Sequence, residues 1–332
     1  GKLEGFGNYT FELSKRICEN HPEHNFYLIF DRAFDPSFVF AKNCKTLILS
    51  PPTRHPFLNI FWVRFPLHKA LKKNKIDLFW SPDGLCDLRT DIPQVITIHD
   101  LNFEHYPEDS PKLVSWYYRY YYPKFAKKAQ HILTVSEYSK QDLVQSYGIT
   151  PNKISVVYNG VSSQFKKASE EIQQQIKIEY SNGKPYFIFV GSIHPRKNVE
   201  RLLKAFDIFY KRNNGFHLLI VGSNMWRNQT LSIPKGIKNA VSFTGHVQVK
   251  TLTQLMSSAF SLVYPPYFEG FGIPLVEAMK TGIPIVSSNQ TCLPEIAGDA
   301  ALYFDPFNEL DMAEKMEKIS TENSLREELI EK

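Results

Sequence analysis

Residues 267–279 read Tyr267-Phe268-Glu269-Gly270-Phe271-Gly272-Ile273-Pro274-Leu275-Val276-Glu277-Ala278-Met279. An apolar run of strand length, residues 260–264, comes shortly before this stretch, and Pro274 has the fixed φ angle that suits the first turn of a helix. The stretch therefore predicts a glycine turn that leads from a buried strand into a helix. Free backbone N–H groups and the positive end of the helix dipole at such a turn favour an anionic or hydroxyl-rich ligand.

The second glutamate of the stretch, Glu277, is expected within the first turn of this helix. There the helix dipole keeps a carboxylate ionised and able to accept hydrogen bonds from sugar hydroxyls. Taken alone, a glycine pair of this kind is more typical of a structural turn with a surface glutamate than of a binding site. The remainder of the chain has to distinguish between the two interpretations.

The composition predicts an ordinary two-domain protein. A chain of 332 residues with 43% apolar residues exceeds what one core usually holds. The formal charge of +5 is small and dispersed, which predicts no nucleic-acid partner. The sequence has no uncharged apolar run of about 18 residues, so we expect no membrane span. Because Cys18, Cys44, Cys86 and Cys292 are scattered, they predict neither a zinc site nor a disulfide framework, and we expect a cytoplasmic protein.

The first half of the chain alternates predicted strands and helices. The histidine of His99-Asp100 follows the predicted strand 94–98, at the end of the strand where open parallel sheets bind ligands. From its position alone, His99 is equally a site residue or a structural cap. Ser136 is expected to cap a helix that Gly148 ends. The other predicted strands are 26–30, 46–49, 76–80, 131–135 and 154–158, and helices are predicted over 59–74 and 111–129.

The chain opens on a glycine-containing loop, Gly5-Phe6-Gly7-Asn8, which runs into a helical pattern with Tyr9, Leu13 and Ile17 spaced by four. A loop of this kind needs a strand before it. We therefore expect that the first strand of the domain is missing from this sequence.

The second half restarts the alternation, with strands predicted over 186–190, 217–222, 241–245 and 283–287. Arg196 and Lys197 follow the strand 186–190, beside the start of a helix that Asn198 can cap. Two cations at a helix N-terminus suit a diphosphate, although a solvated pair is the commoner fate of such a dipeptide. The predicted division is a first domain over 1–161, a connection over 162–183 and a second domain over 184–332.

With these motifs in order, the sequence resembles a retaining glycosyltransferase of family 4, whose GT-B fold is α/β with two Rossmann-like domains facing each other across a cleft. The resemblance rests on residues 268–279, 191–198 and 288–306, and more weakly on 99–100, 135–136 and 157–161. Each motif alone is weak, but several in the right order are specific. The chain differs from the family at Asn8, where an arginine is common, and the C-terminal helices that return to the first domain are not in evidence after Lys332.

The resemblance implies a role for each matching residue. Arg196 and Lys197 would bind the donor pyrophosphate and stabilise it as it leaves, and Glu277 would accept the ribose hydroxyls. Glu269 would contact the transferred sugar, and His99 would lie near the reaction centre. The backbone groups that would approach the donor belong to Gly5, Gly7, Gly270, Phe271, Gly272 and Ile273.

The expected reaction moves a sugar from a nucleotide-diphosphate sugar to an acceptor hydroxyl in cell-surface glycan or polysaccharide synthesis, with no metal and no other cofactor. The sequence contains no Asp-x-Asp motif, and Arg196 and Lys197 supply the charge that a divalent ion would otherwise bring. The alternatives are a nucleotide-sugar epimerase on the same fold and a two-lobed sugar-binding protein without chemistry. The second alternative leaves the two cations without a function.

A glycan or a lipid-linked molecule is the expected acceptor. The basic helix end Lys69–Lys75, beside Phe61, Trp62 and Phe65, can rest on the inner face of an anionic membrane. A solvated helix face is the more ordinary interpretation of the same residues.

Overall fold

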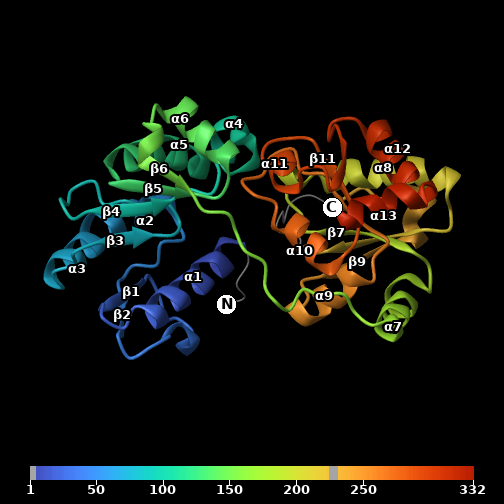
Figure 1. Ribbon diagram of the computed structural model, residues 1–332. Helices are drawn as coiled ribbons and strands as arrows, with labels where there is room; N and C mark the ends of the chain where they lie inside the picture. The colour runs from blue at the N-terminus through green and yellow to red at the C-terminus, as the bar shows by residue number, and fades with distance from the viewer. Residues whose placement is uncertain (1–4, 224–230) are drawn as a thin grey trace. The chain divides into compact units, whose positions relative to one another are not determined.

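The computed structural model describes residues 5–223 and 231–332, and the chain divides into two compact units, Gly1–Val157 and Tyr158–Lys332. Each unit is built of alternating strands and helices (Figure 1). Among the described residues, every helix is too short or too polar to span a bilayer.

The division lies slightly before the predicted boundary at residue 161, and the predicted connection 162–183 is not a free linker. Its helix α7 (Glu170–Ser181) buries Ile176 and packs against α9 (Val249–Ser257) of the second unit. The Ala168 N–H also donates to Ser257 Oγ at 2.6 Å. The polar sequence of this segment therefore reflects a surface helix, because only one of its faces is covered.

The first unit contains two sheets, and all described strand pairs in it are parallel. β1 and β2 pair from Phe26–Cys44 to Phe30–Ile48, and β3, β4, β5 and β6 form a four-stranded sheet in that order. The elements are α1 (Phe6–Asn20), β1 (Phe26–Phe30), β2 (Cys44–Ile48), α2 (Pro56–Trp62), η2 (Val63–Leu67), α3 (His68–Lys73), β3 (Phe79–Ser81), β4 (Gln94–Thr97), α4 (Asn102–His105), α5 (Lys112–Lys128), β5 (His131–Thr134), α6 (Glu137–Tyr147) and β6 (Ile154–Val156), with short turns at Pro36–Phe38, Pro107–Asp109 and Pro151–Lys153.

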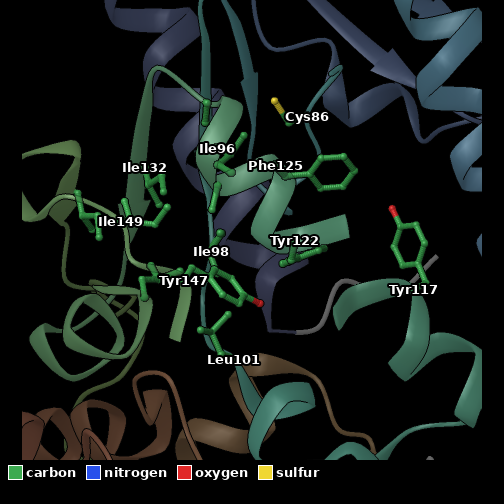
Figure 2. Packing of buried hydrophobic residues seen from close by; sticks show 14 residues of the cluster. Cys86, Ile96, Ile98, Leu101, Tyr117, Tyr122, Phe125, Ile132, Tyr147 and Ile149 are labelled. Atoms are coloured by element: carbon green, nitrogen blue, oxygen red, sulfur yellow. The ribbon is translucent and has the colours of Figure 1, made fainter. Parts of the chain in front are cut away.

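The core of the first unit lies where α5 covers the sheet. Figure 2 shows Ile96 of β4 and Ile132 of β5 among the buried side chains, with Phe125 and Tyr122 of α5 in the same cluster. The tyrosine-rich helix α5 therefore contributes Tyr117 and Tyr122 to this core. The opposite side of α5 remains in solvent and carries Trp116 and Tyr120.

Helix α1 begins earlier than the sequence predicts. Gly5 adopts a φ of 46° at the N-cap, and its carbonyl accepts from the N–H groups of Asn8 and Tyr9. Gly7 is consequently inside the first helical turn and is not part of an open loop. Gly5, as the N-cap, has the positive φ that glycine tolerates best.

The second unit is a single six-stranded parallel sheet in the order β12-β11-β10-β7-β8-β9. From the centre of the sheet, β7, β8 and β9 follow one another toward one edge, and β10, β11 and β12 follow one another toward the other edge. This is the doubly wound Rossmann arrangement. The other elements are η5 (Pro195–Lys197), α8 (Val199–Arg212), η6 (Lys235–Ala240), α10 (Ile273–Thr281), α11 (Leu293–Ala297), α12 (Glu309–Thr321) and α13 (Asn323–Glu331) around β7 (Tyr186–Val190), β8 (His217–Val221), β9 (Val241–Gly245), β10 (Ser261–Tyr264), β11 (Ile285–Ser288) and β12 (Ala301–Phe304).

Candidate functional site

The candidate donor site lies where the strand order of the second unit reverses. β7 and β10 are neighbours in the sheet, although they are far apart in the chain. Arg196 and Lys197 follow β7, and the glycine turn 268–272 follows β10. The crevice at such a reversal, beyond the carboxyl ends of the strands, is where doubly wound sheets bind ligands. The fold therefore brings the two predicted loops to one place.

Backbone and amide hydrogen bonds hold these two loops together. The Tyr267 N–H donates to the Arg196 carbonyl at 3.1 Å. The Asn198 side chain donates to the Pro265 carbonyl at 3.1 Å and to the Pro306 carbonyl at 2.7 Å. Asn198 occupies the N-cap position of α8, but its side chain makes no capping hydrogen bond. The prediction that Asn198 caps α8 through its side chain was wrong, because the side-chain amide instead joins its own loop to the loops of Pro265 and Pro306.

Three charged side chains meet between the loops. Lys197 Nζ lies 2.5 Å from Oε1 of the buried Glu269, and Arg196 Nη1 lies 3.5 Å from the same oxygen. Lys197 also donates to the Tyr264 hydroxyl at 2.9 Å, and Arg196 donates to the Phe268 carbonyl at 3.3 Å. With two cations and one carboxylate, the cluster carries a formal charge of +1 at the edge of the sheet.

The electrostatics of the cluster keep Glu269 ionised. Burial acts to raise the pKa of this carboxyl, but the charges of Lys197 and Arg196 outweigh it, so the pKa lies below its ordinary value. Tyr264, also fully buried, has its hydroxyl pKa raised well above normal by burial and by the charge of Glu269. Lys197 is therefore held between an anion and a neutral hydroxyl.

The glycine turn leads directly into α10. Gly272 is the N-cap with a φ of 87°, and a Cβ atom there would lie 2.6 Å from Leu293 Cδ2. Glycine is therefore favoured at this position by its conformation, and a larger residue would also require the Leu293 side chain to shift. Gly270 and Phe271 are buried beside it, and Ile273 begins the helix. The turn places a helix N-terminus next to the charged cluster, as the sequence predicts.

Glu277 differs from its prediction in position and in charge. It is beyond the first turn of α10, in which the structure has no acidic residue. The side chain is partly buried, and burial raises its pKa to about 7. The carboxyl is therefore only partly ionised at neutral pH, whereas the sequence predicts that it stays ionised, because its desolvation is not offset by a neighbouring cation or by the dipole of the first turn.

The other predicted site residues, His99, Gly5 and Gly7, belong to the first unit. His99 follows β4, and its Nε2–H donates to the Pro82 carbonyl at 3.0 Å. Its ring packs edge to face on Tyr9 of α1, with centroids 4.8 Å apart. Burial lowers the pKa of His99, so the imidazole is neutral at physiological pH. His99 is thus fixed in one tautomer against the helix that Gly5 begins.

Four contacts of the site were missed from the sequence: that of Lys197 with the Tyr264 hydroxyl and three hydrogen bonds between distant segments. Tyr264 ends an apolar strand, and a polar tip at that position was the only available signal. The Glu269 N–H donates to Thr291 Oγ1 at 3.3 Å, and the Cys292 thiol donates to the Glu269 carbonyl at 3.2 Å. The Tyr158 hydroxyl donates to Glu295 at 2.9 Å. No sequence pattern predicts these pairs, because they join distant segments.

One group in the described part of the chain has the spacing of metal ligands: His21, Glu23 and His24. All three are exposed and follow α1, and none is a candidate site residue. The donor site instead combines two cations and a glycine turn, which suit an anion, with two glutamates that are not adjacent in the sequence.

Comparison with known families assigns both halves of the chain. Residues 3–165 match the family model Glycosyltransferase Family 4, and residues 170–332 match Glycosyl transferases group 1. O-antigen chain mannosyltransferase B of Escherichia coli is 28% identical over 330 residues, covering 93% of this chain and 84% of that protein. O-antigen chain mannosyltransferase RfbU of Salmonella typhimurium is 31% identical over 238 residues, covering 70% of this chain and 63% of that protein, which is less than two thirds.

Solved structures agree on the fold. WaaG, a glycosyltransferase involved in lipopolysaccharide biosynthesis, has a TM-score of 0.77 at 18% identity and covers 100% of this chain and 91% of its own. Sucrose-phosphate synthase from Thermosynechococcus elongatus has a TM-score of 0.78 at 17% identity, and the match covers 98% of this chain and 87% of that chain. HepE of Anabaena, in complex with UDP and glucose, has a TM-score of 0.76 at 17% identity, and the match covers 99% of this chain and 90% of that chain.

The alternative of an epimerase is not supported, because both family matches are to glycosyltransferases and the two relatives above are named as mannosyltransferases. A binding protein without chemistry fails on the same ground. The chain belongs to glycosyltransferase family 4 and is a glycosyltransferase with the GT-B fold.

Proposed function

We propose that this glycosyltransferase moves a sugar from a nucleotide-diphosphate sugar to an acceptor hydroxyl with retained anomeric configuration and without a metal ion. The observation that carries the proposal is the cluster of Arg196 and Lys197 at the strand-order reversal, beside the N-terminus of α10. Two cations and a helix dipole stabilise a diphosphate as negative charge builds up on it.

In the transfer, the bond between the anomeric carbon and the diphosphate oxygen breaks, a bond to the acceptor oxygen forms, and the acceptor proton passes to the departing diphosphate. Arg196 offers a planar fork of donors to the leaving diphosphate, and Lys197 offers a point charge. Glu269 positions Lys197 through the 2.5 Å ion pair and, as the family resemblance implies, contacts the transferred sugar. Backbone groups of Gly270, Phe271, Gly272 and Ile273 approach the donor.

Glu277 is assigned to the ribose hydroxyls of the nucleotide. Burial raises the pKa of Glu277 to about 7, so part of the carboxyl population is protonated near neutral pH before the donor binds. Hydrogen bonds from the ribose hydroxyls favour the ionised carboxylate. Donor binding near neutral pH then releases a proton. His99, whose Nε2–H donates to the Pro82 carbonyl, is assigned a place near the reaction centre, as the family resemblance implies. Gly5 and Gly7, at the start of α1, approach phosphate and acceptor.

Mannose is the first candidate for the transferred sugar, and a cell-surface polysaccharide is the proposed product. The names of the Escherichia coli and Salmonella relatives support both assignments. The proposed location is cytoplasmic, with peripheral contact at the inner face of the membrane, where a lipid-linked acceptor is presented. The basic segment Lys69–Lys75 supports that contact.

A thermal-shift panel of UDP, GDP, ADP and their sugars tests donor binding, because a ligand that binds only the folded state raises the melting temperature. The stabilising donor, a mannosyl donor first, is then incubated with an acceptor in EDTA, and the anomeric proton of the product is followed by NMR. The proposal predicts a glycoside with the anomeric configuration of the donor. Inverted configuration, or turnover that requires an added divalent ion, contradicts it.

A further inference from the structure

Two helices of the first unit present aromatic side chains to solvent at matching intervals. Phe57, Phe61 and Phe65 follow one another every four residues along α2 and η2, and they are between 47% and 55% exposed. Trp116 and Tyr120 have the same spacing on α5 and are 45% and 49% exposed. An interval of four places side chains on one side of a helix. Apolar groups gathered in this way on a surface mark an interaction site.

The two rows of rings are joined. The Tyr117 hydroxyl of α5 donates to Asn59 Oδ1 of α2 at 2.6 Å, which fixes the helices against each other. The Phe57 and Trp116 ring centroids lie 6.1 Å apart, and the Trp116 and Tyr120 rings stack at 5.7 Å with an angle of 12°. We therefore treat these rings as one surface, the aromatic face, consisting of Phe57, Phe61, Phe65, Trp116 and Tyr120.

The exposure of the aromatic face is not needed for folding. The inner side of α2, η2 and α3 already forms its own core cluster, made by Trp62, Val63, Leu67 and Leu71. Trp62 Nε1 also donates to the Leu49 carbonyl at 2.6 Å. Since the helices are anchored from the other side, the outer rings can contact a partner without loss of the fold.

Positive charge flanks the aromatic face along its helices. Residues 54–75 and 110–135, which contain both helices, include no aspartate or glutamate. Lys124 Nζ lies 3.1 Å from the Tyr120 ring centroid, and Arg89 Cζ lies 5.5 Å from that of Phe65. Further exposed cations continue along the same helical segment, at Arg64, Lys69, Lys72 and Lys73.

Two glutamates, Glu104 and Glu108, line a groove of about 760 Å³ together with Trp116 and Tyr120. Of these, Glu104 is paired with Arg119 at 3.1 Å, and Glu108 is exposed. Two carboxylates therefore border one end of the aromatic face, whereas the end formed by η2 and α3 is cationic.

We propose that the aromatic face docks on an anionic lipid bilayer, with its rings in the interfacial layer and the cations of η2 and α3 against lipid phosphates. Aromatic rings with a basic flank have the chemistry that interfacial binding requires. A second copy of the chain would bring the same cations and no carboxylate from these helices, so like charges disfavour it as the occupant. This inference deepens the peripheral contact proposed above and rests on that proposed function.

Vesicle flotation of the full chain tests the surface without any sugar donor. The wild type should float with vesicles of phosphatidylcholine and phosphatidylglycerol and remain behind with phosphatidylcholine alone. Lys72→Gln with Lys73→Gln should lower the partition coefficient roughly thirtyfold, since each cation near an anionic surface contributes about fivefold. Phe61→Ser with Phe65→Ser should also reduce flotation. Ile178→Ser, at a 68% exposed site on α7, and Lys250→Gln are matched controls that should float like the wild type.

The inference is overturned if the wild type does not float, or if both double variants float as well as the controls. It is also overturned if sedimentation shows a dimer that Phe61→Ser with Phe65→Ser dissociates, because the occupant would then be a second copy. Transfer to a water-soluble acceptor should be unchanged in both double variants. That readout separates failure of the lipid surface from failure of the proposed transferase activity.

Discussion

Replacing Glu277 by Gln should make the protein more stable at alkaline pH. Burial raises the pKa of Glu277 from 4.5 to about 7, and glutamine has the shape of the protonated carboxyl without its titration. A carboxyl whose pKa is raised by folding stabilises the fold below its unfolded pKa, and this contribution is lost as the pH rises through the folded value. A difference of about 2.5 in pKa corresponds to roughly 3 kcal/mol of unfolding free energy above pH 8.

The assay is urea unfolding of wild type and Glu277→Gln between pH 5 and pH 9. The difference between their unfolding free energies should be smallest at pH 5 and should grow to roughly 3 kcal/mol in favour of the variant by pH 9. Glu314→Gln, at an exposed position on α12, controls for the loss of a charge. If the two curves stay parallel over this range, Glu277 titrates alike in the folded and unfolded chains, and the burial argument fails.

The remaining predictions concern the supports of the site. Lys197→Gln leaves buried Glu269 without its closest cation and should cost about 3–5 kcal/mol in urea unfolding, most of which Glu269→Gln should restore in the double variant; an additive double variant would argue against the pair. Gly222→Ala should destabilise the second unit strongly, because a Cβ atom would lie 1.9 Å from the Gly191 carbonyl oxygen; a melting temperature near that of the wild type would refute the close approach. Ser136→Ala removes the cap of α6 and should cost about 1 kcal/mol, measured by urea unfolding; an unchanged midpoint would show that the cap contributes nothing.

Much of the fold follows from local pattern. The strands 26–30, 186–190 and 241–245 have the bounds that their apolar runs predict, and Ser136 and Gly148 cap α6 as expected. The predicted strand 76–80 begins later, at Phe79, because the Ile76 N–H still bonds to the Leu71 carbonyl at the helix end. Such shifts arise where a helix end and a strand start compete for the same residues.

The sequence predicts which loops form the site, but not the pKa values or the contacts of all their side chains. The positions of Arg196, Lys197 and Glu269 follow from the order of strands, since parallel strands present their loops at one edge. The protonation of Glu277 did not follow, because desolvation depends on what the tertiary structure packs around the side chain. Which rings of α5 face solvent does not follow from the sequence either, because periodicity finds a helix with several aromatic residues but does not say which side the core covers.

The most direct test of the donor site is the turnover of Arg196→Gln. This substitution leaves the 2.5 Å pair of Lys197 and Glu269 in place, so the unfolding free energy should change little. If Arg196 stabilises the departing diphosphate, kcat should fall by about 100-fold or more. Arg212→Gln, which removes an exposed partner of Glu317 at the other end of α8, should keep wild-type kcat. A kcat for Arg196→Gln within a few-fold of the wild type would contradict the assignment of the cationic cluster to the leaving group.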